Sequence, residues 1–197
     1  MEENMNVEIV EKVNKSDKNM ESIYDMASVV VSAILTVGII FAFLFKISTV
    51  SGESMENTLH NGDKLIISAI TQDVKYGDVV VTSQPNGHGK VLIKRVIAVG
   101  GQTVWFNEET NKVVVDGKEL DEPYIKEEME FLLSMTNLYR VPEGKIFVMG
   151  DNRNDSADSR DALIGMIDER YVVGKVIYRI GDKNLFNSEF KELQNVR

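Results

Sequence analysis

The sequence predicts a mainly β protein, in which an antiparallel β-sheet domain follows one membrane helix. Past residue 60, short runs rich in β-branched residues alternate with turn residues, a pattern typical of antiparallel sheets. The dipeptide Asp116-Gly117 is a hairpin-turn signal. Residues 125–138 fit either a short helix or an irregular loop. The runs that we expect to form strands are KLIISAI (64–70), GDVVVTS (77–83), KVLIKRVIAVG (90–100), QTVWF (102–106), KVVVDG (112–117), KIFVMGD (145–151) and VVGKVIYRI (172–180).

The membrane helix is predicted from an uncharged run, MASVVVSAILTVGIIFAFLF (26–45), which Asp25 and Lys46 bound. At ~1.5 Å per residue this run spans ~30 Å, the thickness of the hydrocarbon core. We therefore expect a transmembrane helix over 26–46. A buried core helix would show a broader polar face, and a cleaved signal peptide usually has a shorter apolar region behind a positive N-terminus.

The charges around this helix favour a cytoplasmic N-terminus, because three lysines (Lys12, Lys15 and Lys18) precede it. Residues 1–25 contain few large apolar side chains and are predicted to be a disordered cytoplasmic tail. Residues 47–197 would then form a domain outside the cell membrane.

Composition excludes several classes of function. The chain has no cysteine and only two histidines, His60 and His88, without a helical H-E-x-x-H pattern, so we expect no metal site. Its formal net charge of −9 argues against nucleic acid as a partner. The segment PNGHGK (85–90) lacks the first glycine and the Ser or Thr of a phosphate-binding loop, and a surface turn explains it.

Lys94 lies inside a predicted strand, where it would share a face with Leu92, Val96 and Ala98 while Arg95 points to the other face. Burial among apolar groups would lower its pKa from ~10.4, and a neutral amine can act as a general base. The alternative is an edge-strand lysine whose ammonium group extends to water.

Ser54, in SGESMENTL (51–59), follows the membrane segment closely. A serine hydroxyl becomes a nucleophile when a base takes its proton, and backbone N–H groups near Gly52 and Ser54 could bind the resulting oxyanion. The alternatives are an ordinary polar turn and a different base, His60, which is near in sequence.

A third segment, GDNRNDSADSR (150–160), crowds short polar and charged side chains directly after a predicted strand. A surface turn with Asx-type hydrogen bonds would explain it. A rigid polar loop that supports a site is the functional interpretation. In that case Asp158 would pair with Arg160 or Arg95, and a serine would orient the lysine amine.

Taken together, these segments resemble the bacterial type I signal peptidases of the Gram-positive, single-anchor kind. The matching motifs are SGESMENTL, GDK (62–64), YGDVVV (76–81), KRVIAVGG (94–101) and GDNRNDSADSR, in the family's order. The resemblance covers about residues 25 to 180. It implies an antiparallel β core of the type shared with SOS-type repressors, with a small inserted subdomain over about 103–142.

The resemblance also implies roles for particular residues. Ser54 would be the nucleophile, Lys94 the general base, and Ser156 the serine that orients the amine. Asp158 and Arg160, with Arg95, would form a structural ion-pair group. The backbone N–H groups of Ser54 and Gly52 would bind the oxyanion. The pocket for a small substrate side chain would be formed by Met55, Leu59, Leu92 and Ile93.

The function implied is a membrane-anchored serine endopeptidase that needs no cofactor and removes signal peptides after an A-x-A-like sequence. Its partners would be preproteins, membrane lipid and the secretion machinery. Three alternatives stay open: a Ser-Lys domain that cleaves its own chain, a processing enzyme dedicated to a narrow substrate set such as pilin-like proteins, and a non-catalytic surface β domain.

Two positions depart from the family pattern. Asn57 stands where the family usually has proline, which would loosen the loop behind Ser54 because proline fixes φ. Gly52 stands where some relatives carry a serine that helps to bind the oxyanion, so this chain would use main-chain N–H groups.

Overall fold

The structure is a computed structural model that describes residues 2–70, 73–83, 91–130, 138–180 and 190–192. The chain divides into two compact units, Met1–Phe43 and Leu44–Arg197, and each is described here by itself. The first unit is helical. The second contains the two β-sheets and all the residues to which the sequence assigns chemistry.

The helix α1 spans Glu2–Leu44, and its segment Ser22–Leu44 is long and apolar enough to cross a bilayer. The mean hydropathy of this segment is 2.6. The helix ends two residues before the predicted end at residue 46. Phe45 and Lys46 belong instead to strand β1 (Phe45–Thr49), because they pair with Ser68 and Ile67 of strand β2 (Lys64–Ser68).

The prediction of a disordered tail over residues 1–25 is wrong for the backbone of residues 2–25, which lies in α1. The prediction rested on the small number of large apolar side chains, and low hydrophobicity alone does not exclude a helical backbone.

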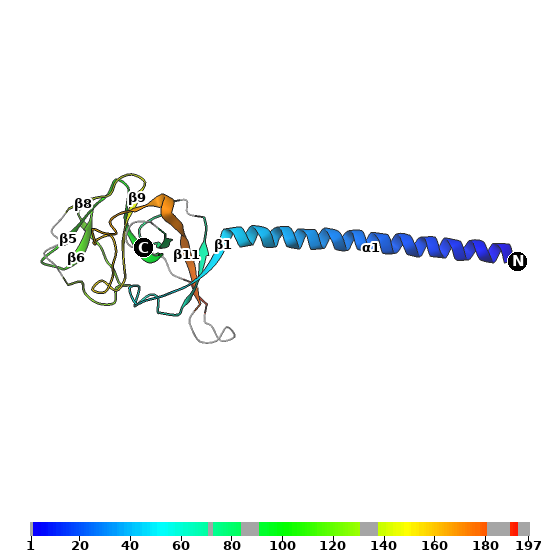
Figure 1. Ribbon diagram of the computed structural model, residues 1–197, viewed down its shortest axis with the longest axis horizontal. Coiled ribbons are helices and arrows are strands. Elements are labelled where there is room, and N and C mark those ends of the chain that lie inside the picture. The colour runs from blue at the N-terminus through cyan, green and yellow to red at the C-terminus, as the bar shows by residue number, and fades with distance from the viewer. Residues whose placement is uncertain (1, 71–72, 84–90, 131–137, 181–189, 193–197) are drawn as a thin grey trace. The chain divides into compact units, whose positions relative to one another are not determined.

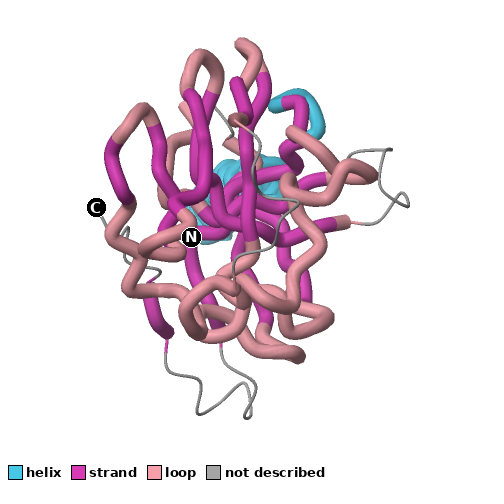
Figure 2. Tube along the Cα trace, turned by 90° about the vertical axis from the view of Figure 1, so that its left-hand side faces the viewer, coloured by secondary structure: helices cyan, strands magenta, loops and turns pink. Residues whose placement is uncertain are grey.

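The main sheet of the second unit has eight strands and confirms the predicted mainly β, antiparallel fold. Its order is β1-β2-β11-β3-β4-β9-β10, with β12 paired to β11, and every pairing is antiparallel. Strands dominate the view in Figure 2, and Figure 1 labels β9, β11 and β1. The strands not yet given bounds are β3 (Val79–Thr82), β4 (Leu92–Val99), β9 (Lys145–Met149), β10 (Ile167–Asp168), β11 (Val172–Ile180) and β12 (Phe190–Glu192). A short 3₁₀ helix, Glu169–Tyr171, leads into β11.

A second sheet of four strands, in the order β7-β6-β5-β8, lies in the chain between β4 and β9. Figure 1 shows β5, β6 and β8 grouped at one end of the folded unit. The predicted hairpin forms at Asp116 and Gly117, whose φ values of 51° and 80° let Val115 pair with Lys118. The strands are β5 (Thr103–Asn107), β6 (Lys112–Val115), β7 (Lys118–Glu119) and β8 (Tyr139–Arg140).

The two sheets share an apolar core, in which Val104 and Phe106 of β5 pack with Phe147 and Met149 of β9. The connection between β7 and β8 is irregular over 121–130, with no helix or strand there. The rest of the segment predicted as helix or loop, residues 131–137, lies outside the described residues.

Strand β4 carries a β-bulge that changes the predicted faces. Its register against β9 shifts between Val96 and Ala98. Leu92 and Val96 pack in one apolar cluster, as the alternation predicts, but Ala98 packs in another. The prediction that Ala98 shares the face of Lys94 is therefore wrong, because a bulge inserts one extra residue and breaks the period of two.

Candidate active site

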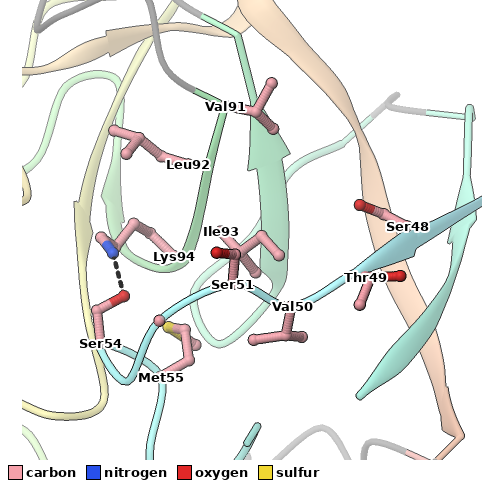
Figure 3. Close-up of a pocket in the computed structure, with 11 residues that line it drawn as sticks. Ser48, Thr49, Val50, Ser51, Ser54, Met55, Val91, Leu92, Ile93 and Lys94 are labelled. Atoms are coloured by element: carbon pink, nitrogen blue, oxygen red, sulfur yellow. Dashed lines mark hydrogen bonds between the residues drawn. The ribbon is translucent and has the colours of Figure 1, made fainter. Parts of the chain in front are cut away.

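Ser54 and Lys94, 40 residues apart in the chain, meet at the edge of a cavity (Figure 3). Ser54 lies in the turn between β1 and β2, and Lys94 lies in β4 opposite Val80 of β3. The Lys94 Nζ donates a hydrogen bond to Ser54 Oγ at 2.6 Å. Lys94 is only 3% exposed, so its amine is held against the hydroxyl rather than extended into water.

Burial lowers the pKa of the Lys94 amine from its ordinary value, since the charged form loses its hydration. The carboxylates of Asp158 and Asp151 oppose this shift, while the positive charge of Arg160 adds to it. The net direction is downward, which favours a neutral amine. With Lys94 neutral, the hydrogen bond reverses and Ser54 Oγ becomes the donor, as proton transfer from serine to lysine requires.

The turn that carries Ser54 is attached to the loop after β9. The Asn152 backbone N–H donates to Ser54 O at 3.1 Å, and Asn152 Nδ2 donates to Glu53 O at 3.2 Å. The side chain of Met55 is buried in the core beneath the turn. These contacts fix the backbone on both sides of the hydroxyl, so the direction of Ser54 Oγ is set by the main sheet.

Of the two backbone groups predicted to bind an oxyanion, Gly52 is excluded by its own hydrogen bond. Its N–H donates to Asn61 Oδ1 at 3.1 Å, with Gly52 at a φ of +100° that favours glycine. Within residues 2–70, 73–83, 91–130 and 138–180, no group accepts a hydrogen bond from the N–H of Ser54. The N–H of Ser54 is thus the candidate donor of the two.

The loop after β9 is braced by a buried carboxylate. Asp158 Oδ2 accepts from the Gly150 N–H at 2.9 Å, and Arg160 Nε donates to Asp158 Oδ1 at 2.8 Å. Burial alone would raise the pKa of Asp158, but the hydrogen bonds and charge of Arg160 outweigh it and hold that pKa below its ordinary value. The lowered pKa favours the ionised form, so Asp158 places a negative charge beside the site.

The resemblance implies a hydrogen bond between Ser156 and the Lys94 amine, but the structure does not contain it. Its Oγ is buried and forms no hydrogen bond with acceptable geometry to any described residue. It lies near enough to the Asp158 carboxylate to help lower the pKa of Asp158. The hydroxyl packs closely against Gly150 instead. The contact leaves no room for a side chain at residue 150, since a Cβ added there would lie 2.3 Å from Ser156 Oγ.

Arg95 pairs with Asp151 and not with Asp158. Its Nε and Nη2 donate to the two Asp151 oxygens at 2.8 and 2.7 Å, and both residues are buried. Arg95 Nη1 also donates to Gly77 O at 2.8 Å, and Thr58 Oγ1 donates to Asp151. The structure therefore contains two separate ion pairs where one shared group was expected.

The cavity beside the pair has a volume of about 290 Å³ and is bounded by β1, the Ser54 turn and the start of β4 (Figure 3). Met55, Leu92 and Ile93 line it, as the predicted pocket requires. Leu59 does not, because it is fully buried in the core below the turn. The residues that sequence reasoning missed are Ser48, Thr49, Val50, Ser51 and Val91.

The rival base His60 has other contacts. Its Nδ1 lies 3.1 Å from Arg179 Nη2 and 4.0 Å from the Asp63 carboxylate. His88 lies outside the described residues. Within the part of the chain that the structure describes, no group of three His, Cys, Asp or Glu side chains is placed to hold a metal ion.

A side chain at residue 150 should displace the turn that carries Ser54. A Cβ there would lie 2.4 Å from Ser54 O and 2.3 Å from Ser156 Oγ, distances at which the Ser54 turn must move. We expect Gly150→Ala to cost about 1–3 kcal/mol in the free energy of unfolding and to abolish most activity. Urea unfolding and a cleavage assay measure the two effects. Gly38→Ala in α1, whose new Cβ meets no atom within 4 Å beyond its chain neighbours and its own helix backbone, is the control and should keep full activity; an active Gly150→Ala variant would contradict this packing.

Comparison with known proteins identifies the family. The family model described as signal peptidase, peptidase S26, matches residues 23–180. Signal peptidase I of Bacillus licheniformis is 37% identical over 172 residues, covering 81% of this chain and 89% of that protein. Signal peptidase I T of Bacillus subtilis is 36% identical over 185 residues, covering 88% and 90%. This chain belongs to the signal peptidase family, peptidase S26, as the resemblance in its motifs predicted.

One less similar relative is also named a signal peptidase. Signal peptidase IB of Staphylococcus aureus is 32% identical over 182 residues, covering 80% of this chain and 92% of that protein. A crystal structure of a signal peptidase I from Enterococcus faecalis is similar with a TM-score of 0.44 and 28% identity, covering 53% of this chain and 97% of that chain.

Proposed function

We propose that this protein is a membrane-anchored serine endopeptidase that cleaves N-terminal signal peptides from exported preproteins, with Ser54 as nucleophile and Lys94 as general base. One observation carries the assignment of roles: the Nζ of a buried lysine, Lys94, lies at hydrogen-bond distance, 2.6 Å, from Ser54 Oγ. Family membership and relatives named signal peptidase I support the substrate class.

The proposed reaction has two halves. Neutral Lys94 takes the proton of Ser54 Oγ as that oxygen attacks the scissile carbonyl, and the N–H of Ser54 donates to the oxyanion. Lys94 then gives its proton to the leaving amine, and the C–N bond breaks to leave an acyl-enzyme on Ser54. Water, losing a proton to Lys94, attacks the ester and releases the signal peptide with a new carboxylate. Ser54 regains its proton.

Met55, Leu92 and Ile93 give the cavity beside Ser54 an apolar lining, which suits apolar substrate side chains. We propose an A-x-A-like sequence before the cut because signal peptides carry such small residues at their cleavage site. No metal or other cofactor has a part in these steps.

The proposed placement follows the order of the chain. The segment Ser22–Leu44 would cross the membrane once, with the N-terminus in the cytoplasm and residues 47–197 as the extracytoplasmic catalytic domain. Residues 103–142 would be its inserted subdomain. A signal peptide's cleavage site emerges at the membrane surface, where a tethered nucleophile would meet it.

The test is cleavage of a purified preprotein with an A-x-A site by the detergent-solubilised full chain, with the product N-terminus read by mass spectrometry. We expect cleavage after the second small residue by the wild type and none by Ser54→Ala or Lys94→Ala. Thr110→Ala, on the exposed hairpin of the second sheet, is the control that should keep full activity. Cleavage that survives Lys94→Ala would remove lysine as the base, and a wild type without activity on several preproteins in lipid would overturn the proposed function.

A further inference from the structure

A buried cluster that the reaction does not use lies between the β7–β8 connection and the loop after β9. Glu122 accepts hydrogen bonds from Arg153 Nη1 and Nη2 at 2.8 and 2.6 Å. The side chains of Arg153 and Glu122 are 1% and 6% exposed. The Tyr124 hydroxyl donates to Glu122 Oε1 at 2.8 Å. Such a pair is costly to bury, so its position near the site calls for a role beyond stability.

Tyr124 lies between two arginines. The guanidinium carbon of Arg95 is 4.0 Å from the centre of the Tyr124 ring, and that of Arg153 is 6.0 Å away. A cation over an aromatic face is attracted by the ring, most strongly where water is excluded. The Tyr124 hydroxyl also lies 3.3 Å from the Tyr76 hydroxyl, and Tyr76 precedes the Gly77 carbonyl that accepts from Arg95. The ring therefore covers one face of the Arg95 guanidinium, while the edges of that group donate the hydrogen bonds.

Arg95 is connected to both members of the Ser54–Lys94 pair. It follows Lys94 directly in β4 and holds Asp151 with two hydrogen bonds. The residue after Asp151, Asn152, donates its N–H to Ser54 O. A displacement of the Arg95 guanidinium would consequently move the strand that carries the amine and the loop that holds the hydroxyl.

We propose that Tyr124, fixed by Glu122 and Arg153, is a positioning residue that locks the Arg95–Asp151 ion pair and thereby sets the distance between Ser54 Oγ and Lys94 Nζ. Its kinetic consequence rests on the proposed function. The segment that joins the second sheet back to the main sheet thus becomes part of the catalytic geometry, although it touches neither substrate nor reacting atoms.

The contact of Tyr124 with Arg95 should also affect the electrostatics around Lys94. The groups that face Lys94 are Ser54, Asp158, Asp151 and Arg160. Arg95 neutralises Asp151, and a looser Arg95 would leave more of that negative charge acting on Lys94. The pKa of Lys94 should then rise, because an uncompensated carboxylate favours the ammonium form. The acidic limb of the activity profile would move to higher pH, since the amine must be neutral to accept a proton.

The experiment compares Tyr124→Leu, which removes the ring, with Tyr124→Phe, which keeps it. The control is Tyr139→Leu, because Tyr139 packs its ring 6.1 Å from that of Phe106 and 5.1 Å from that of Phe147 in the core of the second sheet. The full chain in detergent is assayed for kcat and KM on a preprotein. The Lys94 amine is titrated by ¹⁵N NMR of labelled lysine, with Lys94→Ala to assign its signal.

We expect Tyr124→Leu to lower kcat about 10²-fold with little change in KM, and to raise the pKa of Lys94. Tyr124→Phe keeps the ring over Arg95 but loses the hydroxyl that donates to Glu122, so its kcat and Lys94 pKa should lie between those of the wild type and Tyr124→Leu. Tyr139→Leu should lose stability alone. A Lys94 titration in Tyr124→Leu that matches Tyr139→Leu overturns the proposal whatever the activity. A wild type that cleaves no preprotein overturns the proposed function instead. The NMR titration of Lys94 then still tests whether Tyr124 positions the Arg95–Asp151 ion pair.

Discussion

Replacing Lys94 with methionine is expected to lower the rate of cleavage about 10²–10⁴-fold while raising the free energy of unfolding. The loss of rate follows from removing the proposed base, whose contribution in other enzymes has this size. The gain in stability follows because methionine fills a similar volume and carries no charge into a site where Lys94 is 3% exposed.

The gain in stability should depend on pH in a defined direction. The pKa of Lys94 is lower in the folded than in the unfolded chain, so the unfolded chain binds more protons between the two values. The destabilisation that charged Lys94 causes is therefore complete below its lowered pKa in the folded chain. It disappears as the pH rises to the pKa of lysine in the unfolded chain, about 10.4. Urea unfolding of the wild type and Lys94→Met across this window should give curves that converge at high pH. Lys112→Met, at a lysine whose side chain is 56% exposed, should follow the wild type, and parallel curves for Lys94→Met would contradict a buried, shifted amine.

Removal of Arg95 is expected to have the largest effect on stability. Arg95→Met leaves Asp151 as a buried carboxylate without its cation, which should cost about 3–5 kcal/mol in the free energy of unfolding. Activity should fall with it, since Asp151 and Asn152 hold the loop behind Ser54. Chemical denaturation and the cleavage assay measure the two losses on the same protein.

A double-mutant cycle separates the ion pair from general damage. Asp151→Asn removes the stranded charge, so Arg95→Met combined with Asp151→Asn should be more stable than the sum of the single changes by about 0.5–3 kcal/mol. The exposed pair Arg170–Asp168 has the same chemistry at 84% and 20% exposure, and Arg170→Met should produce no measurable change. Strict additivity at Arg95 and Asp151 would show that their contact contributes nothing.

The sheet strands could be predicted because their apolar residues recur along short β-branched runs. Each of the seven predicted runs coincides with one strand whose first and last residues lie within two residues of those of the run, and β11 matches its run, Val172–Ile180. The strands that were not predicted, β1, β8, β10 and β12, have five residues or fewer. β1 begins directly after α1, so its first two residues, Phe45 and Lys46, were included in the predicted transmembrane helix.

Contacts between distant segments of the candidate site could not be predicted from local sequence patterns. Those patterns placed Ser54 in a turn and Lys94 in a strand, and only the family resemblance predicted that the two residues act together. Nothing local distinguishes Asp151 from Asp158 as the partner of Arg95, because both lie in one crowded loop and the choice is made by the register of β4 against β9. The hydrogen bond that occupies the Gly52 N–H and the burial of Leu59 are likewise tertiary facts.

The position of Tyr124 between two arginines could not be predicted from the sequence. Its neighbours Arg95 and Arg153 lie 29 residues to either side of it, and no periodicity links them. A buried ion pair such as Glu122–Arg153 is invisible in composition, since most charged side chains in any sequence are solvated.

The position of Ser54 within the main-sheet unit has a consequence for what helix α1 can contribute. Every described partner of Ser54 and Lys94 lies in the unit Leu44–Arg197, on strands and loops of the main sheet. On the proposed function, the chemical step is then a property of that unit, and the helix contributes by effective concentration. Confining enzyme and substrate to one surface makes encounter a two-dimensional search, which acts on the apparent KM and leaves the turnover number alone.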